Sequence, residues 1–99
     1  MSDFENYLAE DARLVILKEL AAQPNASLNE TILTKVLETF GYNKSREWVR
    51  TQMRKLAELG AVSITEAGTV LIATLRQPGL DHVKRRVFLD GVNQPSLDR

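Results

Sequence analysis

The chain has 99 residues, of which 43% are hydrophobic and 26% are charged. This length suits one domain, because a second domain would have too few residues to bury an apolar core. With five Gly, three Pro and no Cys, the composition excludes collagen-like and mostly disordered chains, disulfide frameworks, thiolate metal sites and Cys nucleophiles. No apolar run approaches the roughly 18 residues of a membrane span, and the first residues do not resemble a signal peptide. We therefore expect a soluble, cytoplasmic protein.

The charge is unevenly distributed, although the formal net charge is zero. Residues 1–43 carry three basic and seven acidic side chains, whereas residues 44–86 carry nine basic and four acidic ones. This asymmetry favours an anionic partner for the second half of the chain. The alternative is an ordinary solvated surface on which the charges cluster by chance.

The spacing of apolar residues predicts a long amphipathic helix over residues 4–22, which Pro24 and Asn25 would end. Within it, the run from Leu14 to Leu17 is continuous. At about 100° per residue, four successive side chains spread over most of the helix circumference. We therefore expect this helix to bury more than one face, one against its own domain and another against a second copy of the chain.

A second helix is predicted to begin at Ser27-Leu28-Asn29-Glu30, which has the form of a capping box. Gly41 suits the left-handed residue after its end. The buried face of this helix is expected to consist of Leu28, Ile32, Leu33, Val36, Leu37 and Phe40.

A third helix is predicted from Ser45, a candidate N-cap, to Leu59, with Gly60 ending it. Its inward residues are expected to be Val49, Gln52 or Met53, Leu56 and Leu59. Arg46, Arg50 and Arg54 recur at intervals of four residues on another face. Glu47 is expected to pair with Arg50 and Glu58 with Arg54, leaving Arg46 and Lys44 without a local partner. Trp48 is expected to be partly buried against the second helix.

The pattern changes to β-type after Gly60. Residues 61–75 predict a hairpin in which Gly68 supplies a positive φ. Pro78 suits the start of a short helix that extends to about Arg86. Residues 91–99 are expected to form an extended or mobile tail. The predicted fold is therefore mainly α with a small β-hairpin (α+β), in the order α-α-α-β-β-α, with a single domain over residues 1–90.

The segment from Ser45 to Val62 includes the exit pattern Leu-x-x-Leu-Gly-x-Val, and Thr65-Glu66-Ala67-Gly68 follows it. Together with Gly79 and Val83, these residues resemble the winged helix-turn-helix family, which includes MarR- and ArsR-type regulators and small phage proteins. The resemblance covers roughly residues 10–86 and names no subfamily.

The resemblance implies a small transcriptional regulator that binds double-stranded DNA, with helix 45–59 in the major groove. The residues expected to face DNA in this segment are Lys44, Ser45, Arg46, Arg50, Thr51 and Arg54. The basic run Lys84, Arg85 and Arg86 is a candidate for flanking phosphate contacts, or a solvated helix end. The family often carries Arg or Lys at the wing tip, whereas this chain has Glu66.

An alternative function from a different class is a protein-interaction or assembly module of phage or mobile-element origin that keeps the winged fold without specific DNA binding. The acidic wing tip and the zero net charge favour it. An enzyme is not expected, because His82 is the only His and no nucleophile frame, phosphate loop or metal-ligand cluster accompanies it. No cofactor and no metal are expected.

Helix-turn-helix proteins commonly bind two-fold-related sites as pairs, so we expect a homodimer. The first helix supplies the candidate interface. Its expected residues are Phe4, Tyr7, Leu8 and Leu14, together with Phe88 and its neighbours Val87 and Leu89. The alternative is that these side chains close the core of their own domain.

Overall fold

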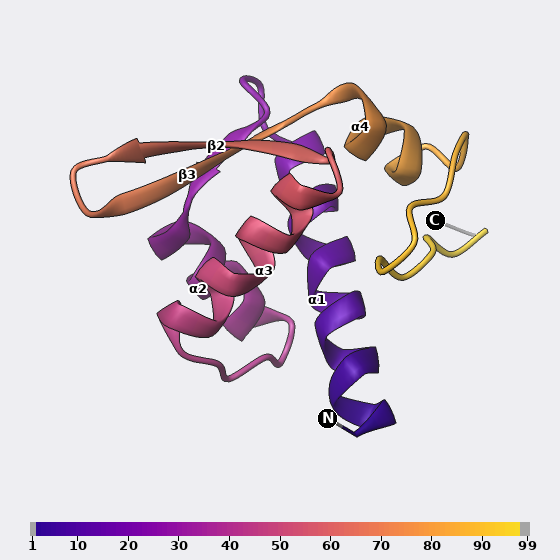
Figure 1. Ribbon diagram of the computed structural model, residues 1–99, viewed down its shortest axis with the longest axis horizontal. Helices are drawn as coiled ribbons and strands as arrows, with labels where there is room; N and C mark the ends of the chain where they lie inside the picture. The colour runs from indigo at the N-terminus through magenta and orange to yellow at the C-terminus, as the bar shows by residue number, and fades with distance from the viewer. Residues whose placement is uncertain (1, 98–99) are drawn as a thin grey trace.

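The chain folds into a helical body that carries a small antiparallel sheet (Figure 1). The computed structural model describes residues 2–97. In that range the helices are α1 (Asp3–Ala21), α2 (Glu30–Thr39), α3 (Arg46–Glu58) and α4 (Gln77–Val83), and the strands are β1 (Ser27–Asn29), β2 (Val62–Ala67) and β3 (Val70–Leu75). The strands are arranged in the order β1-β3-β2. The predicted α+β class is confirmed, and the arrangement is winged-helix-like, with the β2–β3 hairpin as the wing.

Helix α1 is the element against which α2, α3, α4 and β3 all pack. Its N-terminus is fixed by a capping box, in which the Ser2 hydroxyl accepts from the Glu5 amide at 3.1 Å and the Glu5 carboxylate accepts from the Ser2 amide at 3.3 Å. Leu14, Ile16 and Leu17 are all buried, which confirms that this helix buries more than one face. Its first two turns are exposed and project beyond the body (Figure 1).

The predicted capping box at Ser27 is wrong, because residues 27–29 form strand β1 instead. This strand pairs with β3, with Ser27 opposite Thr74 and Asn29 opposite Ile72. The true N-cap of α2 is Asn29, whose side chain accepts from the Ile32 amide at 2.8 Å. A strand of three residues is too short to show an alternating pattern, and the free edge of β3 provides the pairing that local sequence cannot indicate.

The buried face of α2 is narrower than predicted. Leu33 and Leu37 are fully buried, but Ile32 is 44% exposed and Phe40 is 58% exposed. The third fully buried residue on this face is the charged Glu30. Glu30, Leu33 and Leu37 follow the i, i+3, i+7 spacing of one helix face, so a carboxylate occupies a position in the apolar stripe.

Helix α3 and the wing largely match the sequence interpretation. Val49, Gln52, Met53 and Leu56 are buried, and Gly68 has a φ of 63° at the wing turn. Helix α4 ends at Val83, earlier than the predicted Arg86, since Arg85 adopts the left-handed conformation with a φ of 62°.

The segment after α4 lacks helix and strand as far as residue 97, but it has anchors that the sequence did not reveal. The buried ring of His82 accepts from the Leu89 amide at Nδ1 (2.9 Å), and its Nε2 lies 2.8 Å from the Asn93 carbonyl oxygen. Asn93 also binds α1, through the Glu10 carbonyl and the Asp11 carboxylate. Val92 is buried as a result of this packing.

Within residues 2–97, no helix is both long and apolar enough to cross a membrane.

Gly79 provides a test of the packing between α4 and the residues that precede the wing. A Cβ atom at this position would lie 2.4 Å from the Ala61 carbonyl oxygen, which is a backbone atom. We predict that Gly79→Ala lowers the free energy of unfolding by about 1–3 kcal/mol, measured by urea denaturation. Gly68→Asn is the control, because nothing lies within 4 Å of a Cβ there and Asn tolerates a positive φ. Equal losses for the two variants would contradict this account.

Candidate nucleic-acid interface

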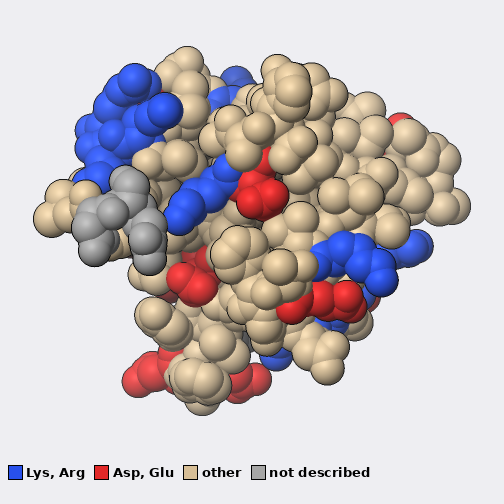
Figure 2. Space-filling model, turned by 180° about the vertical axis from the view of Figure 1, so that it is seen from behind, with Lys and Arg blue, Asp and Glu red and all other residues tan. Residues whose placement is uncertain are grey.

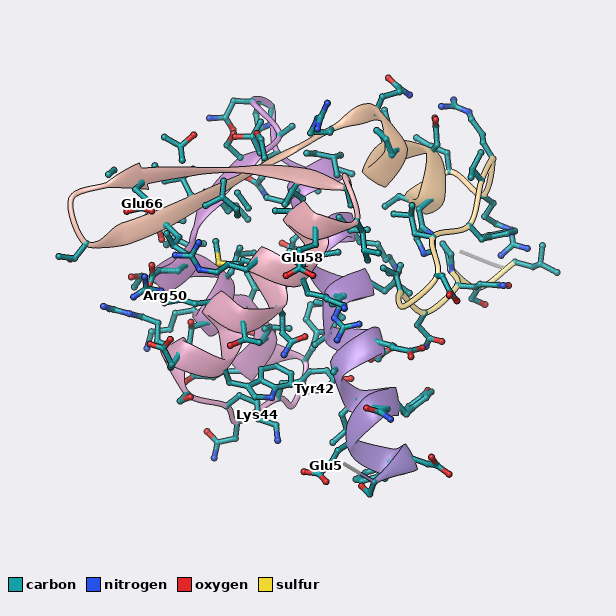
Figure 3. All side chains as sticks on the ribbon, in the orientation of Figure 1. Glu5, Tyr42, Lys44, Arg50, Glu58 and Glu66 are labelled. Carbon is teal, nitrogen blue, oxygen red and sulfur yellow. The ribbon has the colours of Figure 1, made fainter. Side chains whose placement is uncertain are left out.

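Helix α3 presents one face to the core and the other to solvent (Figure 3). Ser45 caps it, since its hydroxyl accepts from the Trp48 amide at 3.0 Å. Of the residues predicted to face DNA, Ser45, Arg46, Thr51 and Arg54 are exposed, and Lys44 and Arg50 are half-buried. Residues 44–58 carry five basic and two acidic side chains, so the surface of this helix is cationic.

The arginines of α3 have a partner that the sequence analysis missed. The Glu30 carboxylate, fully buried, lies 3.0 Å from Nε of Arg46 through Oε2 and 3.7 Å from Nε of Arg50 through Oε1. Its Oε1 also accepts from the Leu71 amide of β3 at 2.5 Å. One carboxylate therefore joins the start of α2, helix α3 and the wing.

This cluster replaces the local ion pairs expected within α3. Arg50 pairs with Glu30 rather than with Glu47, and Arg46 is paired rather than free. Glu58 lies 3.9 Å from Lys55 rather than pairing with Arg54. Within residues 2–97, Arg54 is in no ion pair and makes no hydrogen bond through its side chain. The three arginines thus differ in how far their charge is paired within the chain. Arg54 is the one whose guanidinium is most available to an external ligand.

Sequence reasoning missed Glu30 because the expected capping box gave its carboxylate another role. The signal that was present is its spacing from Leu33 and Leu37, which places it on the buried face of α2. A buried carboxylate needs compensating charge or hydrogen bonds, and that requirement indicates a basic partner from another element.

Trp48 and Lys44 form a second feature at the start of α3. The Lys44 ammonium lies 5.3 Å from the centroid of the Trp48 ring. Trp48 is partly buried, as predicted, and it borders a hollow of about 180 Å³ between α1 and α3. Its packing against the second helix stays a prediction. The contact holds the Lys44 charge next to the first turn of the helix, beside the exposed Ser45.

The wing contributes no positive charge to this face. Residues 62–75 contain no Lys or Arg, and Glu66 is exposed close to the tip (Figure 3). A carboxylate there repels phosphate, so any contact of the wing with a nucleic-acid backbone is unfavourable.

The basic run at residues 84–86 directly follows α4, at the end of the molecule away from the start of α3 (Figures 1 and 2). Arg85 donates to the Pro95 carbonyl and lies over the Phe88 ring at 5.3 Å. Arg86 lies 3.1 Å from the Asp81 carboxylate. Hydrogen bonds from Gln77 and Arg86 lower the pKa of Asp81. Two of these three cations are thus engaged within the chain, and the structure does not bring the run together with the α3 residues.

The residues predicted for a dimer interface fall into two groups. Phe4 and Tyr7 are 68% and 55% exposed on the projecting turns of α1, and Phe88 is 43% exposed. Leu8 is half-buried. Leu14 belongs to the core and is only 7% exposed, so it offers almost no surface to a second copy. This part of the expectation is corrected, because α1 uses that position to close its own domain.

Comparisons with known proteins relate the chain to phage and bacterial sequences. It is 39% identical over 88 residues to "Uncharacterized protein gp26" of Escherichia phage Mu, covering 89% of this chain and 91% of that protein. It is 34% identical over 61 residues to an uncharacterized protein of Haemophilus influenzae, covering 62% of this chain and 59% of the other. The chain matches no protein-family model and no solved structure.

The different environments of Arg50 and Arg54 lead to a stability prediction. Arg50→Ala removes one of the two cations that compensate the buried Glu30 carboxylate, so we expect a loss of about 1–3 kcal/mol in the free energy of unfolding. Arg54→Ala changes an exposed side chain with no ion pair and should stay within about 0.5 kcal/mol of the parent. Urea denaturation of both variants checks this, and equal stabilities would show that Glu30 does not depend on Arg50.

Proposed function

We propose that this chain, which belongs to the same family as gp26 of Escherichia phage Mu, is a non-enzymatic protein that binds double-stranded DNA through α3. Its role would be that of a small transcriptional regulator acting in the cytoplasm. The observation that carries the proposal is the exposed cationic face of α3, capped at Ser45 and backed by the buried Glu30 carboxylate.

The shape of this face suits a duplex. An α-helix with its side chains is about 10–12 Å wide, and the major groove of B-DNA is about 12 Å wide. Arg46, Thr51 and Arg54 lie on the exposed side of α3 within its first nine residues, which is the part of a recognition helix that reaches base edges. Arginine can bind guanine through two hydrogen bonds or neutralise a phosphate.

A second candidate function is an assembly module that uses the same fold to bind protein. The specific observations in its favour are the acidic wing tip at Glu66 and the exposed apolar side chains of Ile32 on α2 and Phe40 directly after it. These residues lie outside the cationic face, so the two functions respond to different substitutions.

DNA binding predicts a strong effect of charge reversal at Arg54. This residue is the suitable probe because its replacement leaves the Glu30 cluster intact, whereas reversal at Arg46 or Arg50 would place like charge beside a buried carboxylate. We expect Arg54→Glu to weaken retardation of a random-sequence duplex at least tenfold while the melting temperature stays unchanged. For about four phosphate contacts in each protomer, log affinity of the parent should fall against log salt with a slope of about −3.6 per protomer.

Lys35→Glu is the matched control for Arg54→Glu. It makes the same change of charge, but on the exposed face of α2 that points away from the core. An equal loss of binding in the two variants would indicate a general effect of net charge. A parent protein that does not retard duplex at low salt would contradict the proposal and favour the assembly module.

We also propose that two copies associate through the projecting turns of α1. Phe4 and Tyr7 are exposed to solvent at neighbouring positions of one helix. Their burial against a second copy would remove apolar surface from water, which favours association. The N-terminal capping box keeps these turns helical without support from the body.

The dimer proposal predicts that Phe4→Ser combined with Tyr7→Ser shifts the protein from dimer to monomer in sedimentation equilibrium. The circular dichroism spectrum of the double variant should match that of the parent, because both side chains are exposed in the monomer. Ile32→Ser, at an exposed apolar position of α2, is the control and should leave the molecular mass measured by sedimentation equilibrium at that of a dimer. A monomeric parent protein would rule out the association.

A further inference from the structure

The interface contains a buried negative charge directly behind two of its arginines, a feature that affinity for DNA does not require. Glu30 is fully buried, and its carboxylate faces Nε of both Arg46 and Arg50. Within residues 2–97, the Nη groups of these two arginines make no hydrogen bond. Each guanidinium therefore lies against the carboxylate through Nε as an ion pair without a hydrogen bond, and its Nη donors remain available for a ligand.

The Glu30 carboxylate has little freedom to move away when a ligand arrives. Its Oε1 accepts from the Leu71 amide of β3, a backbone group held by strand pairing with β2. Asn29 caps α2 next to it and fixes the backbone from which the side chain extends. The negative charge consequently remains beside the arginines in the bound state as well as in the free state.

A fixed carboxylate affects two kinds of acceptor differently. A phosphate carries a full negative charge, so it is repelled by Glu30 across the width of one guanidinium, and buried charges are screened less than exposed ones. The N7 and O6 atoms of guanine are neutral acceptors, so their hydrogen bonds to Nη lose much less. A guanidinium backed by a carboxylate thus favours a base edge over the phosphate backbone.

Resting on the DNA-binding function proposed above, we propose that Glu30 is a specificity-determining positioning residue. It orients the Arg46 guanidinium for a guanine in the major groove and lowers the affinity of this face for phosphate in general. Arg46 is the arginine that contacts the guanine, because its side chain is 53% exposed, against 29% for Arg50. Arg54, which has no acidic partner in the described chain, supplies phosphate contact instead.

The test compares the parent with Glu30→Gln and Arg46→Lys. Glutamine keeps the side-chain oxygen that accepts from Leu71 but removes the charge, and lysine keeps the charge of Arg46 but not its planar pair of donors. Each protein selects duplexes from a randomised 20-base-pair pool, and its affinity for the unselected pool is measured at two salt concentrations. The guanine enriched by the parent is then replaced by 7-deazaguanine, which lacks the N7 acceptor.

We expect Glu30→Gln to bind the unselected pool roughly tenfold more tightly than the parent and to lose at least tenfold in preference for the selected guanine. Arg46→Lys should lose the same preference without a gain in general affinity. The 7-deazaguanine duplex should weaken the parent but not Arg46→Lys.

Other outcomes overturn the inference. A purely structural Glu30 would make Glu30→Gln lose affinity for all duplexes in parallel with its melting temperature. If Glu30→Gln does not fold, Arg46→Lys and the 7-deazaguanine duplex still test the inference. An unchanged guanine preference in Arg46→Lys counts against it. Binding by the parent that Arg54→Glu weakens, together with no guanine preference, would refute the role of Glu30 and retain DNA binding. Absence of any binding by the parent would refute both.

Discussion

The structure depends on how one buried carboxylate is compensated. Removing a carboxylate from water is costly unless charges and hydrogen-bond donors replace its hydration. Glu30 obtains opposite charge from Arg46 and Arg50 and a hydrogen bond from the Leu71 amide. These partners come from α3 and β3. The helix and the wing are therefore held in one relative orientation by a polar contact, in addition to the apolar core between α1, α2 and α3.

This contact also changes how the arginines of α3 should be viewed. On sequence they form a regular series at intervals of four residues, which indicates a uniform cationic ridge. In the structure they have three distinct environments: Arg46 is half-exposed and paired, Arg50 lies deeper against Glu30, and Arg54 is in no ion pair within residues 2–97. Equal spacing on a helix therefore does not make equal sites, because the surrounding elements determine the field at each position.

Much of the fold could be predicted because it follows from local patterns. The long α1, the capped start of α3 at Ser45 and the wing turn at Gly68 all have short-range signals in periodicity, capping and φ preference. Strand β1 could not be predicted, since three residues next to a capping-box sequence acquire their conformation only by pairing with β3. The Glu30 cluster was missed for a related reason. Its partners lie 16 to 41 residues away, so no local pattern reveals them.

The packing of residue Arg13 has a mechanical consequence for the molecule. Its Nε donates to the Gln52 side chain in the middle of α3, and its Nη1 donates to the Gly91 carbonyl in the segment after α4. A single planar group on α1 thus links α3 to the C-terminal segment. Because α4 follows β3 directly, tension applied to that segment would reach the centre of α3 through Arg13 and would reach the wing through α4.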